Sequence, residues 1–390
     1  MLDLSVANET EKRRDLEVRM RRVFRSYGYR EIDAPVLMDY DTLRTAGSTA
    51  EDVAYKLVDE GGRILVLRPD MTAPIADMAA RRWTEVPRPI RVSYFARLFR
   101  RELGEREFFQ AGAEIIGSED DRADAEAVGL CAQLLEDAGV GRYQINLGHT
   151  GVIGEIADSV GLDQSQKALL RDALSRRDIV AVEGILGGLS SARSRRAELL
   201  LPYSGVLDRE GLDGLAEAGV GEALIGEISH LLMLLGDYAP AAAVGFDPSL
   251  VRNLDYYTGP VFEVYCPDTG DYLGGGGRYD GLMGSFGVPE AATGFAVDMG
   301  AVASAASSNG GLADADQTIL VLANDGDGGS GMSLVRDLRG EGHRVVLESI
   351  AGAGDARIRA RANELGAQRV FVVGDEIREF HLDAESGESS

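Results

Sequence analysis

The spacing of apolar residues along the chain predicts helices and strands in mixed order. Residues 10–26 have helical periodicity, with one apolar face made of Leu16, Met20, Val23 and Phe24. Gly28 then stands where a left-handed residue commonly ends a helix. The next residues, 29–37, predict an extended segment, and Pro35 restricts it to an edge or an interface.

Extended and helical segments then alternate through the first 150 residues. Strands are predicted at residues 63–68, 91–99, 108–117 and 143–147. Helices are predicted at residues 70–83 and 121–138. Pro69 stops the first of these strands, and the second and third predict an antiparallel hairpin.

The predicted secondary structure of the second half of the chain changes from mixed to helical and then back to strands. Residues 151–237 are dominated by Leu, Ala, Arg and Glu at helical spacing, which predicts a helical insertion. Strand character returns at residues 251–265 and, after a turn, toward Leu273. Residues 293–297 predict one more short strand that leads into a helix. Small and polar residues over 303–316 have the composition of a linker.

Beyond this linker, strands at 318–323, 344–347 and 369–373 are separated by helical stretches. That alternation is typical of a small parallel α/β domain. The sequence therefore predicts an α+β chain. Its expected parts are a core of residues 1–150 and 238–302, a helical insertion at 151–237, a linker at 303–316, a shortened α/β domain at 317–383 and a tail at 384–390.

The composition narrows the class of protein. At 390 residues, 45% hydrophobic and 27% charged, the chain has room for two or three globular domains. No apolar run reaches the roughly 18–20 residues of a membrane span, and the N-terminus has no apolar signal segment. Cys131 and Cys266 are too few for a disulfide framework, which suits a reducing cytoplasm. Four separated histidines without a Cys-x-x-Cys motif give no recognisable metal site.

The charge of the chain is strongly acidic. Asp plus Glu total 64 against 40 Lys plus Arg, for a formal net charge of −24. Nucleic-acid binding draws most of its affinity from basic side chains on phosphates, so this charge argues against a polyanion partner. The excess acid equally fits a role in solubility or a salty habitat.

Polar residues occur where a purely structural sheet would not need them. Asp70 and Thr72 lie between a strand and a helix, where they either face a ligand or cap the helix. On the second strand of the hairpin, Gln110, Gly112 and Glu114 are spaced by two and share one face. That face is either a polar pocket floor or a solvent-facing side.

Two later segments are unusual for strands. Arg252 stands close to Tyr256 and Tyr257, a charge and aromatic content that fits a pocket wall. The four glycines 274–277 are unfavourable inside a strand, at about 0.5–1 kcal/mol each. Close approach of the backbone to a ligand is one explanation. A nucleotide P-loop is rejected, because the Gly-Lys-Ser/Thr ending is absent.

Taken in order, six short motifs resemble histidyl-tRNA synthetase, a class II aminoacyl-tRNA synthetase. They are Leu67-Arg-Pro-Asp-Met-Thr72, Phe99-Arg-Arg-Glu102, Phe108-Phe-Gln-Ala-Gly-Ala-Glu114, Leu254-Asp-Tyr-Tyr257, Gly276-Gly-Arg-Tyr-Asp-Gly281 and Gly294-Phe-Ala296. Each motif alone is weak, whereas the ordered set is specific. The resemblance implies a six- or seven-stranded antiparallel sheet flanked by helices, and a histidine pocket. It also implies a homodimer interface built from the first helix and the Pro35 strand.

The resemblance assigns roles to the polar residues. The implied histidine-binding residues are Asp70, Thr72, Arg100, Gln110, Glu114, Arg252, Tyr256, Tyr257 and Tyr279. Arg252 is expected to hold the ligand carboxylate through two parallel hydrogen bonds, and Arg100 to contact a carboxylate or phosphate. The ammonium group would meet Asp70, Thr72 and Gln110. The imidazole nitrogens would meet Glu114, Tyr257 and Tyr279, which penalises a ligand without matching groups.

Two departures from the synthetase pattern point away from ATP chemistry. Synthetases of this family begin a helix with a sequence like Gly-Phe-Ala-x-Gly-Leu-Glu-Arg, whose arginine binds ATP. Here Gly300 and Ala301 occupy the Glu and Arg positions, so the positive charge that phosphoryl chemistry requires is lost. The loop after Arg100, which ends near Arg106, is several residues shorter than the synthetase loop over ATP and tRNA.

A histidine-binding relative without ATP chemistry resembles the regulatory subunit of ATP phosphoribosyltransferase, a paralogous family. The resemblance implies a non-catalytic cytoplasmic chain without a cofactor. It would activate a short catalytic subunit for the first step of histidine biosynthesis and mediate histidine feedback. The implied partners are histidine, that catalytic subunit and a second copy of this chain, with no tRNA and no membrane. The alternatives are an active, divergent histidyl-tRNA synthetase and a histidine-sensing adaptor for another partner.

Overall fold

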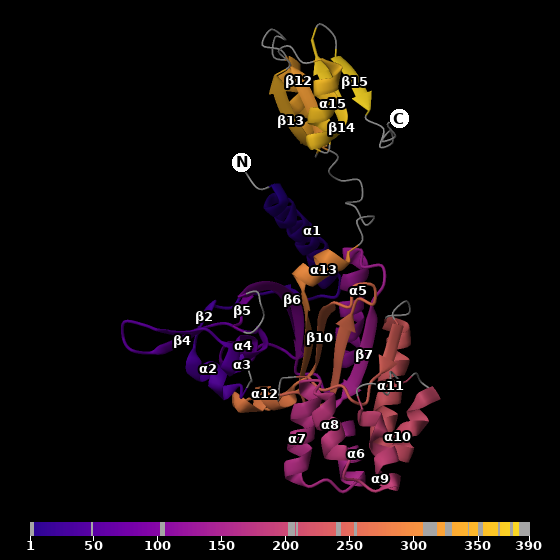
Figure 1. The fold of residues 1–390 in the computed structure, drawn as a ribbon. Helices are drawn as coiled ribbons and strands as arrows, with labels where there is room; N and C mark the ends of the chain where they lie inside the picture. Colours follow the sequence, from indigo (N-terminus) through magenta and orange to yellow (C-terminus); the bar gives the residue numbers. More distant parts are fainter. Residues whose placement is uncertain are drawn as a thin grey trace. The chain divides into compact units, whose positions relative to one another are not determined.

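The chain forms two compact units that divide between Ser307 and Ser308. The structure, a computed structural model, describes residues 4–47, 50–101, 106–201, 207, 210–238, 243–252, 256–306, 318–323, 330–341, 343–349, 354–365, 367–374 and 377–381. Figure 1 shows both units, with their helices and strands labelled where there is room. Among the described helices, none has the length and apolar character that crossing a membrane would require.

The larger unit is built on an eight-stranded sheet of order β1-β5-β6-β11-β10-β9-β7-β8. Its strands are β1 (Arg30–Glu31), β5 (Ile90–Phe99), β6 (Glu107–Ile116), β7 (Gln144–His149), β8 (Ala243–Phe246), β9 (Pro260–Tyr265), β10 (Tyr272–Arg278) and β11 (Ala292–Asp298). The α+β class is confirmed. The six central strands, from β5 to β7 in this order, are antiparallel as expected, and β1 and β8 add at the two edges in parallel.

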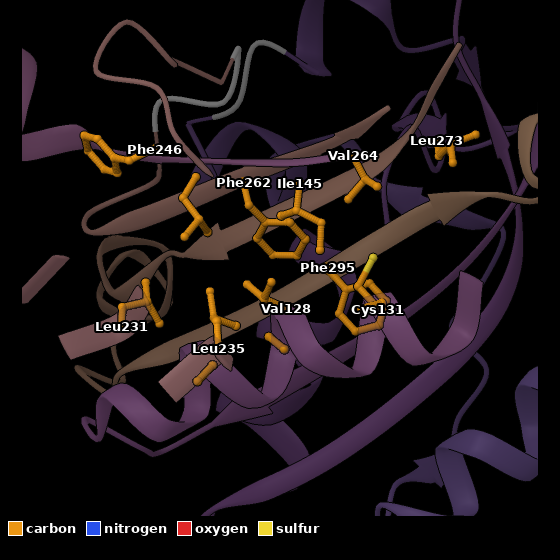
Figure 2. Close-up of a cluster of buried hydrophobic side chains, with 14 of the residues drawn as sticks. Val128, Cys131, Ile145, Leu231, Leu235, Phe246, Phe262, Val264, Leu273 and Phe295 are labelled. Carbon is orange, nitrogen blue, oxygen red and sulfur yellow. The ribbon is translucent and has the colours of Figure 1, made fainter. Parts of the chain in front are cut away.

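Helices α1 (Leu4–Ser26), α5 (Asp121–Ala138) and α13 (Met299–Ala305) form the core with this sheet. Helix α5 packs on β10 and β11, and α1 packs on α5. The predicted bounds of α5 are confirmed, since Asp120 caps its first turn and the left-handed Gly139 (φ 87°) ends it. Figure 2 shows the apolar side chains between α5 and the strands, including Val128, Cys131, Phe262, Val264 and Phe295.

The segment between β7 and β8 is helical, which confirms the insertion in the predicted fold class. Its elements are α6 (Thr150–Ser159), α7 (Gln164–Ser175), α8 (Ile179–Leu186), α9 (Ser191–Ala197), η1 (Glu198–Leu200), η2 (Glu210–Leu212), α10 (Asp213–Ala218) and α11 (Glu222–Tyr238). In Figure 1 these helices gather at one end of the larger unit. Helix α11 packs on α5, which joins the insertion to the core.

A second, small sheet in this unit lies beside the main one. It contains β2 (Leu37–Asp39), β3 (Lys56–Val58) and β4 (Ile64–Leu67) in the antiparallel order β2-β4-β3. The helices near this small sheet are α2 (Tyr40–Thr45), α3 (Ala50–Val53), α4 (Thr72–Arg82) and α12 (Asp280–Ser285). The buried Arg68 fastens this sheet to β5, because its Nε donates to the carbonyl of Arg97 at 3.1 Å.

Two strand predictions are corrected. The strand predicted over residues 251–265 begins only at Pro260; Val251, Arg252 and residues 256–259 are not in a strand, and residues 253–255 lie outside the described part. The four glycines, in contrast, lie inside the central strand β10. A Cβ at Gly276 would stand 2.0 Å from the carbonyl oxygen of Gly294. The glycines therefore permit the close approach of neighbouring strands and side chains.

The smaller unit has a four-stranded sheet of order β13-β12-β14-β15. Its elements are β12 (Thr318–Ala323), α14 (Ser330–Gly340), β13 (Arg344–Ser349), α15 (Asp355–Glu364), β14 (Ala367–Val373) and β15 (Ile377–His381). The predicted parallel strands are confirmed, and β15 adds an antiparallel edge that the sequence did not reveal. The tail 384–390 lies outside the described residues.

We predict that Gly276→Ala lowers the free energy of unfolding by about 2–3 kcal/mol, because the added methyl group forces β10 and β11 apart. Gly284→Ala is the matched control. A Cβ there meets nothing within 4 Å, and alanine favours the helix α12 by up to about 1 kcal/mol. Urea denaturation of both variants measures the difference, and equal midpoints would contradict the packing argument.

Candidate functional site

One face of the central strands has few bulky side chains. Cross-strand partners share a face, and two rows of them cross the middle of the sheet. The first row is Glu114, Gly294 and Gly277. The second row is Tyr94, Gly112, Ala296, Gly275 and Glu263. The small residues leave room for polar side chains along the sheet, opposite the apolar face in Figure 2.

Two glycines of this face leave the space that particular polar side chains occupy. A Cβ at Gly294 would stand 1.8 Å from Oε2 of Glu114, and one at Gly275 would stand 2.0 Å from Nη1 of Arg252. A side chain at either position would displace a charged group. Gly275 thus gives room to Arg252, a group that lines the site, and close approach of the glycine run to a ligand stays a prediction.

Glu114 is the centre of a buried hydrogen-bond cluster. Its side chain is 2% exposed, and it accepts from the hydroxyl groups of Tyr279 at 2.6 Å and Thr72 at 3.1 Å. Burial raises the pKa of Glu114 to about 8, against the opposing effect of these two hydrogen bonds. The carboxyl group is therefore partly protonated near neutral pH. The suggestion of a solvent-facing strand side is wrong for this residue.

Asp70 combines the two roles that the sequence left open. Its Oδ1 accepts from the backbone N–H of Ala73 at 2.9 Å, within the first turn of α4. Its Oδ2 is buried and has no hydrogen-bond partner among the described residues. Burial raises the pKa of Asp70. One oxygen thus caps the helix, and the other meets no donor among the described residues.

Three tyrosines and Arg252 form the wall of the site. The ring centroids of Tyr256 lie 5.0 Å from Tyr257 and 5.9 Å from Tyr279. The Arg252 guanidinium lies 5.7 Å from the Tyr257 ring and 5.9 Å from the Tyr272 ring. Its Nη1 donates to the carbonyl of Phe262 at 3.0 Å. A guanidinium has five N–H donors, so Arg252 can also hold a carboxylate.

The remaining predicted residues are placed around this cluster. Nε of Arg100 donates to the carbonyl of Pro69 at 2.7 Å, one residue before Asp70. Gln110 is half-buried and shares the face of Glu114, at the end of the sheet where Asp298 is its cross-strand partner. The structure therefore brings eight of the nine predicted ligand residues into one cluster and places Gln110 at its margin.

The positions of the missing ATP-binding groups contain a capping carboxylate. Oδ1 of Asp298 accepts from the N–H groups of Gly300 at 2.8 Å and Ala301 at 2.9 Å, at the start of α13. Asp298 was not among the predicted site residues, although an aspartate before a helix is a known capping signal. Three further residues of this face, Tyr94, Glu263 and Tyr272, were not predicted as site residues either. Among the described residues, no group of three or more His, Cys, Asp or Glu side chains could hold a metal ion.

Comparisons with known proteins give the family. A family model described as histidyl-tRNA synthetase matches residues 4–302. The ATP phosphoribosyltransferase regulatory subunit of Symbiobacterium thermophilum is 38% identical over 386 residues, which cover 94% of this chain and 94% of that protein. The chain belongs to this family of regulatory subunits. The family member of Bacillus subtilis is 32% identical and covers 84% of each chain.

Solved structures agree with this assignment. An ATP phosphoribosyltransferase regulatory subunit/histidyl-tRNA synthetase from Bacillus halodurans C is similar, with a TM-score of 0.79 and 29% identity. The match covers 93% of this chain and 94% of that one. The histidyl-tRNA synthetase from Nostoc sp. PCC 7120 has a TM-score of 0.76 over 96% of this chain and 94% of that one. At 18% identity, that likeness shows the fold alone.

We predict that Glu114→Gln removes part of the pH dependence of stability in this regulatory subunit. Burial raises the pKa of Glu114 from 4.5 to about 8, so the folded protein holds a proton that the unfolded chain releases. The free energy of unfolding therefore falls as pH rises through this window, by up to about 1.4 kcal/mol per pH unit. Denaturation at pH 5, 7 and 9 measures this slope.

The control for this prediction is Glu107→Gln, at the exposed start of the same strand, where Glu107 pairs with Arg97. It should keep the wild-type slope, whereas Glu114→Gln should gain stability relative to wild type as pH increases. Parallel curves for wild type and Glu114→Gln would show that the buried carboxyl group does not carry the proton.

Proposed function

We propose that this chain is a histidine-binding regulatory subunit without catalysis of its own. It acts in the cytoplasm with the short catalytic subunit of ATP phosphoribosyltransferase, in the first step of histidine biosynthesis. The observation that carries the proposal is the contrast between two ends of one sheet face. One end has a buried set of polar groups suited to histidine, and the other has the Asp298 carboxylate where phosphate-binding cations would be needed.

Each functional group of histidine has a matching partner in the site. Arg252 suits the carboxylate, and the unpartnered Oδ2 of Asp70 suits the ammonium group. Glu114 suits an imidazole nitrogen, because its carboxyl group can accept or donate a proton near neutral pH. A ligand with an apolar side chain would leave Glu114 and Tyr279 without a new partner, which supports selectivity for histidine.

The same face does not suit ATP. Asp298 uses the N–H groups at the start of α13 and adds negative charge there. Gly300 and Ala301 provide no cation. Arg106 is exposed at the end of the short loop, and residues 102–105 before it lie outside the described part. The absence of tRNA binding is proposed on the chain's net charge of −24.

The regulatory role requires a partner and a differential affinity. Histidine can inhibit only if it binds the active and inhibited assemblies with different affinities. We assign the short catalytic subunit as the partner because the chain belongs to the family of regulatory subunits. The proposal also includes a homodimer that forms through α1 and the Pro35 segment. It further includes the division of residues 1–383 into a core, an insertion, a linker and a small α/β domain.

We predict that calorimetric titration of the purified chain gives binding heat with histidine and none with ATP. Arg252→Ala and Glu114→Ala should each weaken histidine binding at least about 100-fold, since each leaves a charged or polar ligand group without its partner. Arg81→Ala is the control, because Arg81 forms an exposed pair with Asp77 on α4. If the wild-type chain binds ATP as well as histidine, the result would support an active synthetase instead.

We also predict that the chain raises the turnover of the short catalytic subunit and makes it sensitive to histidine. Arg252→Ala should keep the activation and lose the sensitivity, if the subunits meet outside the pocket. Histidine-dependent exchange of pyrophosphate into ATP by the lone chain would contradict the proposal. Histidine binding without any effect on the catalytic subunit would identify the chain as an adaptor for another partner.

A further inference from the structure

Arg177 has an unusual backbone conformation. Among the described residues it is the one non-glycine residue with a left-handed backbone, at φ 53°. It lies in the turn between α7 and α8, where Asp178 N donates to the carbonyl of Ala173 at 2.9 Å. Glycine is the usual residue at such a helix end, and another residue is less favourable by about 1 kcal/mol. The arginine side chain must therefore offset this cost or serve another purpose.

The side chain of Arg177 crosses from the insertion to the main sheet. Its Nη2 donates to Oε2 of Glu263 at 2.7 Å and also contacts the hydroxyl group of Tyr265. Glu263 and Tyr265 are two residues apart on β9, so both lie on the face of the candidate site. The carboxylate of Glu263 is mostly buried, with 14% of its side chain exposed.

Glu263 is also a neighbour of Arg252. Gly275 is its cross-strand partner, and the Arg252 guanidinium lies directly over Gly275. A second connection passes through aromatic rings, because Tyr265 lies 5.5 Å from Tyr272, and Tyr272 lies 5.9 Å from the Arg252 guanidinium. One carboxylate thus stands between two guanidinium groups, one from the insertion and one from the ligand site.

We propose that Arg177 is a positioning residue that couples the helical insertion to Arg252, the residue that holds the ligand carboxylate in the proposed function. This inference rests on the proposed function of Arg252 as the group that holds the ligand carboxylate. Arg177 draws the negative charge of Glu263 away from Arg252 and leaves Arg252 available to the ligand. Ligand binding in turn strengthens the contact between Glu263 and Arg177 and orders the turn between α7 and α8. The coupling is reciprocal, as for any two linked sites.

The test uses the full chain and histidine. Arg177→Gly relieves the left-handed backbone while it removes the pair with Glu263, so the two effects oppose each other and the variant should fold with near wild-type stability. It should bind histidine about five- to tenfold more weakly, since Glu263 then competes with the ligand for Arg252. Arg177→Lys keeps the charge and should retain most of the affinity. Arg176→Ala is the control, because Arg176 is exposed and pairs with Asp172 on its own helix.

A double variant separates coupling from a merely structural role. Glu263→Gln removes the competing charge, so Arg177→Gly combined with Glu263→Gln should bind as Glu263→Gln alone does. Hydrogen exchange over residues 164–186 should slow on adding histidine to wild type and stay unchanged in Arg177→Gly.

Wild-type affinity in Arg177→Gly would overturn this inference. So would equal weakening by Arg177→Gly with or without Glu263→Gln, since Glu263 would then not transmit the effect. In both outcomes, loss of binding in Arg252→Ala would leave the proposed function intact. Undiminished histidine binding in Arg252→Ala would overturn the proposed function and this inference together.

Discussion

The structure depends on one arrangement, in which the Glu114 carboxyl group lies flat against β11. Burying such a group is costly unless it is hydrogen-bonded, and its partners come from two other elements. Thr72 belongs to the first turn of α4, and Tyr279 follows β10. The cluster therefore fixes α4 and the end of β10 against β6. It is possible only because Gly294 has no Cβ to occupy the space of the carboxylate.

This arrangement contains polar groups whose burial does not favour stability. A buried oxygen of Asp70 has no partner among the described residues. Burial also holds the pKa of Glu114 at about 8, far from the value that the unfolded chain would have. Such strained polar groups concentrate at functional sites. Under the proposed function, the ammonium group of histidine would meet Asp70 and its imidazole would meet Glu114.

The sequence predicted the elements whose stability is local. Helix α5 has its cap, its apolar face and its terminal glycine within one segment, and the β5–β6 hairpin has clear alternation. It failed for β10, whose glycines disfavour a strand until Gly294 and Arg252 are placed beside them. Most polar residues of the site stood out by their positions in the sequence, and the resemblance assigned their roles. Their hydrogen bonds, and the left-handed Arg177, arise from contacts between distant segments that residue spacing does not contain.

The proposed absence of ATP chemistry rests on an added carboxylate as well as on the lack of a cation. At the start of α13, the side chain of Asp298 takes the N–H groups of Gly300 and Ala301, which are the groups that an anion would use at a helix start. An arginine restored at position 301 alone would stand beside this carboxylate and pair with it before meeting a phosphate. The other end of the same face contains the buried cluster around Glu114. Under the proposed function, this contrast lets one sheet face bind an amino acid while it excludes a nucleotide.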